Sequence, residues 1–128
     1  MTLERIVIIL TASFFLLYGL AFSLVPVNMA LAITGSEPQG ISALVDFQAT
    51  YGGMTVAVGL TLFYLYSMGQ GRACLVIVII VLLSMAATRS LGLEMHGPGN
   101  FLMYLYLALE LLGSALATIA LRGISAEK

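Results

Sequence analysis

The sequence predicts an all-α polytopic membrane protein, with four transmembrane helices in one bundle. Hydrophobic residues make up 61% of the 128 positions, and charged residues make up only 9%. A soluble domain carries about 25% charged residues, so this chain lacks the polar surface that it would need to face water on all sides. Four apolar segments of about 20 residues or more follow one another, which is the length that a helix needs to cross a hydrocarbon core. We expect a single domain over residues 1–128.

Short segments that contain glycine or proline separate the predicted spans. The spans cover approximately residues 6–25, 42–68, 73–93 and 101–121. The connection between the first two spans, residues 26–40, is the longest, and it begins with Pro26. Proline is favourable at the first position of a helix. A short interfacial helix that ends before Gly35 is therefore one interpretation of this connection, and a loop is the other.

The first apolar segment has two interpretations, a retained helix and a cleaved signal peptide. The run Ala21-Phe22-Ser23 resembles a small-residue cleavage site. The apolar stretch is longer than a usual signal core, however, and Glu4 weakens the positive start that a signal peptide has. We therefore expect a retained helix.

The distribution of basic residues predicts the orientation in the membrane. One end of the predicted bundle carries Arg5, Arg72, Arg122 and Lys128. The connections at the other end, residues 26–40 and 94–100, contain no Lys or Arg. Because cytoplasmic loops are enriched in basic residues, we expect both termini in the cytoplasm and the protein in the bacterial inner membrane. Tyr104 and Tyr106 then lie near the outer interface, where tyrosine is enriched.

Two opposite charges, Arg89 and Glu110, fall inside consecutive predicted spans. A charge in the membrane interior costs about 3 kcal/mol or more and by default indicates a functional site. Helical side chains lean toward the N-terminus of their helix. The two spans run in opposite directions, so Arg89 and Glu110 lean toward each other. Asp46 lies about one turn into the second span, at a similar depth.

We therefore predict a buried polar cluster in the outer half of the bundle. Its members are Asp46, Gln48, Tyr51, Arg89 and Glu110. A structural ion pair that fixes helix register is favoured slightly over a role in catalysis or transport. For Arg89 the alternative is a side chain that extends to the outer interface. For Asp46 it is a helix-start residue stabilised by free backbone N–H groups.

Small residues on the second and fourth spans predict close helix packing, because they let helices approach in the membrane. They are Ala49, Gly52, Gly53, Ala57, Gly59, Gly113 and Ala117. On the second span they lie on two nearly opposite faces. We therefore expect that span to have neighbours on both sides.

The run DFQATYGG, from Asp46 to Gly53, resembles the signature of an uncharacterised family of small four-helix bacterial membrane proteins, a domain of unknown function. That family typically shows an Asp, an Arg two positions on, and then Ala-x-Tyr-Gly-Gly in its second helix. It also tends to carry an Arg late in the third helix and a Glu within the fourth, which Arg89 and Glu110 match. Gln48 departs from the pattern, since the family usually has Arg there. The resemblance implies the fold and no activity.

Other chemistry is sparse. The chain has one cysteine, Cys74, and one histidine, His96, which does not suit a metal or haem site. No basic run indicates a nucleic-acid partner. We expect no cofactor and no metal, and we assign no catalytic residues.

Three functions remain open. We favour a non-enzymatic accessory or structural subunit of a larger membrane complex, which acts through helix–helix contacts, because the loops are too short to carry a soluble domain. Apart from the lipid bilayer, the expected partner is that complex or further copies of the chain. The first alternative is a small oligomeric transporter or proton-coupled carrier that uses Glu110. The second is an intramembrane lipid-modifying enzyme, with Asp46, Tyr51 and Glu110 as acid and base candidates.

Overall fold

The computed structural model describes the backbone of residues 2–126 and the side chains of residues 2–124, and this part of the chain is helical without strands. The long helices are α1 (Leu3–Leu24), α5 (Gly71–His96) and α6 (Phe101–Ala126). Among the described residues, these three helices are long and apolar enough to cross a membrane, which indicates a membrane protein.

A further helical rod covers residues 41–67 and consists of α3 (Ile41–Phe47), a π-helical segment η1 (Gln48–Met54) and α4 (Thr55–Ser67). The backbone stays in the right-handed helical region at both junctions, at Gln48 and at Thr55, so the rod is continuous. A π-helix disturbs the regular hydrogen bonding of the backbone. The Thr55 hydroxyl compensates by donating to the carbonyl oxygens of Tyr51 and Gly52. No residue pattern in the sequence predicts this π segment.

The connection between α1 and α3 contains the short helix α2 (Pro26–Thr34). Pro26 occupies the start of the helix, where its missing N–H is not needed. Gly35 ends the helix with a φ of 80°, a left-handed conformation that glycine adopts without strain. The helical interpretation of this connection is therefore confirmed.

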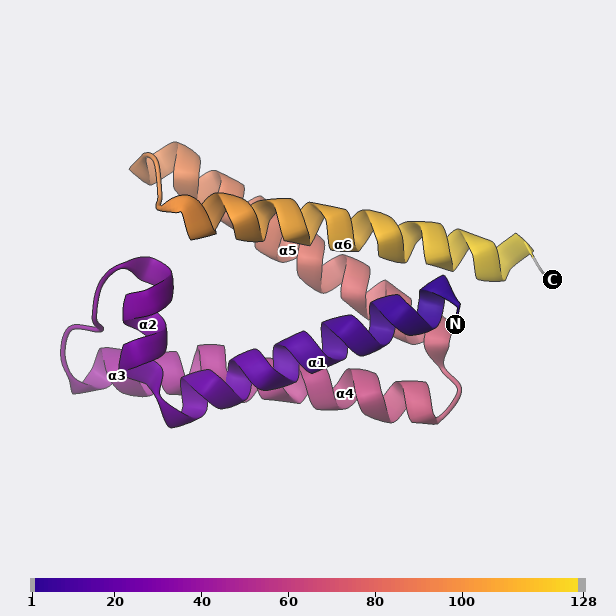
Figure 1. The fold of residues 1–128 in the computed structure, drawn as a ribbon, viewed down its shortest axis with the longest axis horizontal. Helices are drawn as coiled ribbons and strands as arrows, with labels where there is room; N and C mark the ends of the chain where they lie inside the picture. Colours follow the sequence, from indigo (N-terminus) through magenta and orange to yellow (C-terminus); the bar gives the residue numbers. More distant parts are fainter. Residues whose placement is uncertain (1, 127–128) are drawn as a thin grey trace.

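The long helices form two pairs. The first pair is α1 against η1 and α4, and the second pair is α5 against α6 (Figure 1). The start of α1, the turn from α4 to α5 and the end of α6 lie at one end of the molecule, which we call the terminal end. The helix α2 and the α5–α6 connection lie at the other end, which we call the α2 end. The two pairs meet at the terminal end and diverge toward the α2 end.

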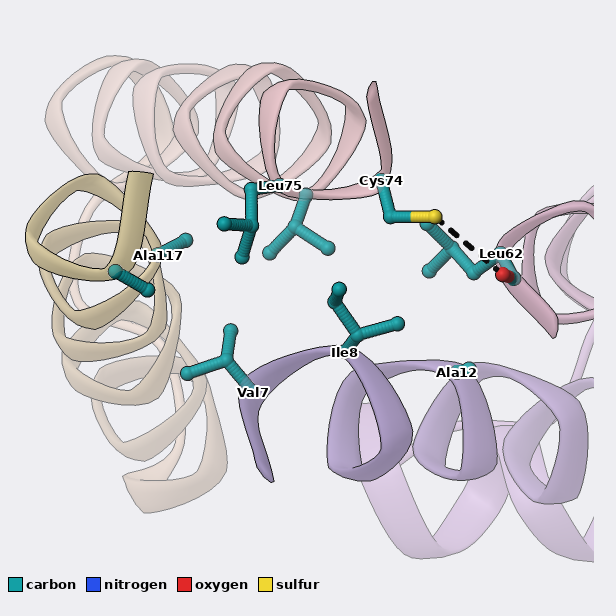
Figure 2. Packing of buried hydrophobic residues seen from close by; sticks show 9 residues of the cluster. Val7, Ile8, Ala12, Leu62, Cys74, Leu75 and Ala117 are labelled. Atoms are coloured by element: carbon teal, nitrogen blue, oxygen red, sulfur yellow. Dashed lines mark hydrogen bonds between the residues drawn. The ribbon is translucent and has the colours of Figure 1, made fainter. Parts of the chain in front are cut away.

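The main hydrophobic core joins the two pairs near the terminal end. Ile8 of α1, Leu62 of α4 and Leu75 of α5 are fully buried in it, and Ala117 of α6 closes it (Figure 2). The Cys74 thiol donates a hydrogen bond to the carbonyl oxygen of Leu62 at 3.5 Å. A smaller core of Phe22, Ala30 and Ile33 packs α2 onto α1 at the other end. Met103 and Tyr106 of α6 also pack against this smaller core.

Candidate functional site

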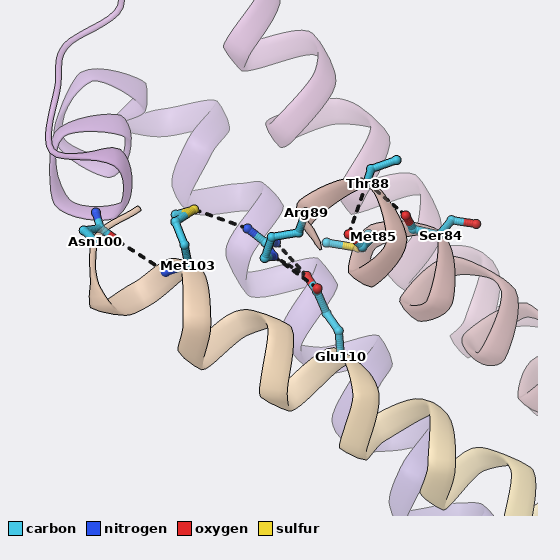
Figure 3. Close-up of polar contacts among 7 residues, drawn as sticks. All are labelled: Ser84, Met85, Thr88, Arg89, Asn100, Met103 and Glu110. Carbon is cyan, nitrogen blue, oxygen red and sulfur yellow. Dashed lines mark hydrogen bonds and ion pairs between the residues drawn. The ribbon is translucent and has the colours of Figure 1, made fainter. Parts of the chain in front are cut away.

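The charges predicted to lie in the membrane interior meet between α5 and α6. The Arg89 guanidinium donates from Nη2 to Glu110 Oε1 at 2.6 Å and from Nε to Oε2 at 3.1 Å (Figure 3). The two side chains are only 19% and 6% exposed. The guanidinium carbon also lies 5.4 Å from the ring centroid of Tyr106, which is a cation–π distance. The pair is therefore a bidentate, largely buried ion pair with an aromatic neighbour.

The other predicted members of the polar cluster do not take part in this ion pair. Asp46 is exposed and makes no ion pair with any described residue. Gln48 donates to the carbonyl oxygen of Ser23 on α1 at 3.1 Å. Tyr51 stacks on Phe22, with ring centroids 5.3 Å apart. Of the five predicted members, Tyr51 borders the same cleft as the ion pair, whereas Asp46 and Gln48 do not. Similar depth in a membrane does not by itself place two residues on facing sides of their helices.

The predicted packing residues fall into two groups, those that contact another helix and those that are exposed. Gly52 and Gly59 are buried against α1, and a Cβ atom on Gly59 would lie 2.8 Å from the carbonyl oxygen of Ala12. Ala117 is buried in the main core. A Cβ atom on Gly113 would come within 2.7 Å of a methyl group of Leu82.

In contrast, Ala49, Gly53 and Ala57 are exposed, so the expected neighbour on that face of the rod is missing among the described residues. The helix α1 packs along most of the rod, and α5 contacts it at α4. Sequence reasoning also missed Gly19, where a Cβ atom would lie 2.7 Å from the carbonyl oxygen of Gly52.

A cleft of about 940 Å³ lies between the two helix pairs, where they diverge. Both pairs line it, and α2 contributes Ile33 and Thr34 at its end. The lining residues of α1 recur every three or four positions from Leu3 to Phe22. That spacing is one helix face, and at 1.5 Å per residue it extends about 28 Å. The cleft is therefore elongated along α1.

The two halves of this cleft differ in chemistry. Toward the α2 end it is bordered by the polar side chains of Tyr18, Tyr51, Thr88, Arg89, Tyr106 and Glu110. Toward the terminal end the lining is mainly aliphatic and includes Leu3, Leu10, Ile80, Leu82, Leu112 and Leu116, with the hydroxyl-bearing Thr11 among them. We call these the polar half and the apolar half. Such a division matches a molecule with a polar head and a hydrocarbon tail.

Aromatic rings connect the polar half into one surface. Tyr18 stacks on Phe14 at 5.5 Å and contacts Phe22 at 5.0 Å. Across the cleft, the rings of Tyr18 and Tyr106 meet edge to face at 6.5 Å. No described residue forms a hydrogen bond with the hydroxyl groups of Tyr18, Tyr51 or Tyr106. These hydroxyls are thus free to bind a further group.

Sequence reasoning missed Tyr18 and placed Tyr106 at the outer interface. Tyr106 borders the cleft, while Tyr104 is exposed and does not. The available signal was the spacing of Phe14, Tyr18 and Phe22, which lie four residues apart on one helix face. That pattern alone does not distinguish a packed core from the wall of a cleft.

Together the fold and the cleft define a small helical membrane protein with an amphipathic cavity beside a buried ion pair. The family model of a domain of unknown function, DUF4345, matches residues 3–121, so the chain belongs to that family. This match confirms the resemblance to an uncharacterised family. No curated protein and no solved structure matches the chain.

Proposed function

We propose that this protein binds a lipid-like, amphipathic molecule in the cleft between its two helix pairs. The observation that supports this proposal is the division of one continuous cleft into a polar and an apolar half. Binding sites for small molecules have a similar composition, since they are mostly apolar with a few polar groups that fix orientation. The volume of about 940 Å³ is also large enough for a molecule of lipid size.

We further propose that α1, the rod of residues 41–67, α5 and α6 are four membrane spans in a bacterial inner membrane. Arg5, Arg72 and Arg122 belong to the terminal end of the molecule, which by the positive-inside rule is then cytoplasmic. Fusing reporter proteins to the C-terminus tests this orientation. A fluorescent protein that is active only in the cytoplasm should be active there, and a periplasmic phosphatase should be inactive.

Native mass spectrometry of the full chain, extracted from its own membrane in mild detergent, tests the binding proposal. A matched pair of variants locates the bound molecule. Leu10 and Leu17 both belong to α1 and are 65% and 66% exposed, but only Leu10 borders the cleft. Leu10→Trp should fill the apolar half and reduce the bound fraction several-fold, whereas Leu17→Trp should leave it unchanged.

Equal retention of the bound molecule by the two variants would place it outside the cleft and overturn the proposal. So would an extract in which the wild-type protein carries no small molecule. The circular dichroism spectrum of each variant should match that of the wild type, which separates loss of binding from loss of fold.

An accessory subunit of a larger complex is the second candidate. It is favoured by the exposed stripe of Ala49, Gly53 and Ala57, because small residues suit close contact with another transmembrane helix. Replacing Gly53 with Leu would block such contact without touching α1. A stoichiometric partner protein in the native mass spectrum, lost on Gly53→Leu, would support this function.

The remaining alternatives receive less support. We do not propose an enzyme, because Asp46 lies outside the cleft that Tyr51 and Glu110 border. A proton-coupled carrier would need Glu110 to exchange protons. Its carboxylate accepts hydrogen bonds from two nitrogen atoms of Arg89, which stabilise the charged form. pH-dependent binding that disappears on Glu110→Gln would revive this alternative.

A further inference from the structure

The polar half of the cleft carries a pair of charges whose sum is zero. Arg89 and Glu110 both border the cleft, and the two compensate each other at hydrogen-bonding distance. A cationic head that entered beside them would meet the guanidinium, and an anionic head would meet the carboxylate. Either charged head would also lose its hydration in an apolar surrounding, which is costly unless a partner compensates. The site therefore favours an uncharged head.

The unused hydrogen-bonding groups of this half are donors. Arginine has five N–H groups, and Glu110 engages only those on Nε and Nη2. The third nitrogen, Nη1, contacts Met103 Sδ at 3.4 Å, and a thioether is a weak acceptor. The edge of the guanidinium at Nη1 is thus available to an oxygen atom with little competition from the protein.

Two tyrosine hydroxyls accompany this guanidinium. The ring centroids of Tyr18 and Tyr106 lie 6.5 Å apart, and both residues border the cleft beside Arg89 and Glu110. The Tyr106 ring itself packs against the guanidinium. Hydroxyl groups donate readily to carbonyl, ester or hydroxyl oxygens. Three donors, from Tyr18 of α1, Arg89 of α5 and Tyr106 of α6, therefore border the same half of the cleft.

We propose that the bound molecule has an uncharged head with oxygen acceptors, such as an ester or hydroxyl group, held by Arg89 Nη1 and the hydroxyls of Tyr18 and Tyr106. Its hydrocarbon tail lies along the apolar half, beside Leu10. This assignment rests on the proposed function and specifies the class of lipid. Glu110 acts as a positioning residue that fixes Arg89 and cancels its charge.

Three probes whose hydrocarbon chains have equal length and one cis double bond test the charge of the head. They are mono-oleoylglycerol, which is uncharged, oleyl sulfate, which is anionic, and oleyltrimethylammonium, which is cationic. The full chain in mild detergent is mixed with all three, and the retained adducts are measured by native mass spectrometry. Mono-oleoylglycerol should be retained at least about tenfold better than either charged probe, because a charge would be desolvated without a free counter-charge.

Variants test the donors. Tyr18→Phe and Tyr106→Phe should each lower the affinity for mono-oleoylglycerol about three- to tenfold, the value of one hydrogen bond. Tyr104→Phe is the matched control, since Tyr104 belongs to α6 but does not border the cleft. Glu110→Gln leaves the guanidinium charge uncompensated, so the preference should shift from mono-oleoylglycerol to oleyl sulfate.

The outcomes separate the two proposals. If Leu10→Trp and Leu17→Trp retain every probe equally, the cleft does not bind chains and the proposed function fails. If Leu10→Trp weakens retention but the wild type prefers a charged probe, only the assignment of the head is overturned. The same holds if Tyr18→Phe and Tyr106→Phe behave like Tyr104→Phe. The wild-type comparison needs no variant, so it stands even if Glu110→Gln does not fold.

Discussion

The two helix pairs of this protein are held together in different ways. In the first pair, α1 approaches the rod at Gly19, Gly52 and Gly59, and a Cβ atom at any of these glycines would meet backbone or side-chain atoms of the other helix at short distance. In the second pair, α5 and α6 are joined by the Arg89–Glu110 ion pair. There a Cβ atom on Gly113 would meet only the end of one flexible leucine, and one on Gly92 would meet nothing.

The contrast shows two solutions to the same physical problem. Lipid supplies no hydrophobic force between helices, so contact must come from close packing or from polar interactions. Close packing leaves no gap between α1 and the rod, so the first pair forms one continuous side of the cleft. In the second pair α5 and α6 also pack along their length, and the ion pair between two long side chains adds a polar contact that leaves donors at its edge. The cleft lies between the two pairs. Its charged groups are those of the second pair, and the first pair contributes the hydroxyls of Tyr18 and Tyr51.

The largest effect should come from breaking the ion pair on one side. Glu110→Leu leaves a buried guanidinium that cannot release its proton, and we expect a loss of about 3–5 kcal/mol in unfolding free energy. Arg89→Met should cost less, because the remaining carboxyl group can take up a proton and become neutral. Unfolding in mixed detergent micelles measures both values.

The double variant Arg89→Met with Glu110→Leu should recover most of the loss, since no unpaired charge remains. Arg72→Met is the control, because Arg72 is an exposed arginine at the opposite end of α5. A double variant as unstable as Glu110→Leu alone would mean that the pair holds α5 and α6 by more than mutual charge compensation.

The next effect concerns the close approach in the first pair. Gly59→Ala places a methyl group against backbone atoms of Ala12 and Leu16, which cannot move aside without shifting α1. We expect a loss of about 1–3 kcal/mol in unfolding free energy, which is typical of overpacking. Gly53→Ala, at an open position of the same rod, should be neutral or stabilising by up to about 1 kcal/mol. Equal effects at the two glycines would contradict the packing assigned to the first pair.

A smaller effect should follow from removing the hydroxyl that supports the π segment. Thr55→Val deletes the donor to the carbonyl oxygens of Tyr51 and Gly52, and we expect a loss of about 1–2 kcal/mol in thermal or detergent unfolding. Thr88→Val removes a similar donor from the regular helix α5, where it is exposed, and should change stability by less than about 0.5 kcal/mol. If Thr88→Val costs as much, the π segment does not depend on Thr55.

The smallest effect should appear where the second pair meets α2. Asn100 Nδ2 donates to the carbonyl oxygen of Ile33 at 2.8 Å, and Asn100 Oδ1 accepts from the backbone N–H of Met103 at 3.2 Å. Asn100→Ala should cost about 0.5–1 kcal/mol, the value of a lost helix cap. Hydrogen exchange should show α2 opening more often. Gln39→Ala, which removes only a local bond to Glu37, should change neither measurement.

How far the sequence predicted the site depended on the kind of inference. The pairing of Arg89 with Glu110 followed from depth and side-chain direction, which suffice for two helices joined by a short loop. Asp46 was joined to them although it is exposed, and the contacts of its rod with α5 are made by α4, at the other end of the rod. The depth of a residue in the membrane follows from counting residues along its helix. The direction in which its side chain points depends on which neighbouring helix packs against that face.

The small residues show the same limit. Gly52 and Gly59 on one face of the rod, and Ala49, Gly53 and Ala57 on another, have equivalent spacing in the sequence. The structure places α1 against only the first set. The rod also contains the π-helical segment η1 between α3 and α4. No residue pattern in the sequence predicts it.

The sequence by itself determined the class of protein, the approximate extent of its apolar helices and the presence of two charges in the membrane interior. These properties depend on composition and on local spacing, which the chain carries in linear order. Only the tertiary structure decided that the helices form two diverging pairs, that Tyr18 and Tyr106 border one cleft, and that this cleft has a polar and an apolar half. Those properties depend on the angles between helices, which arise from packing contacts between residues far apart in the chain.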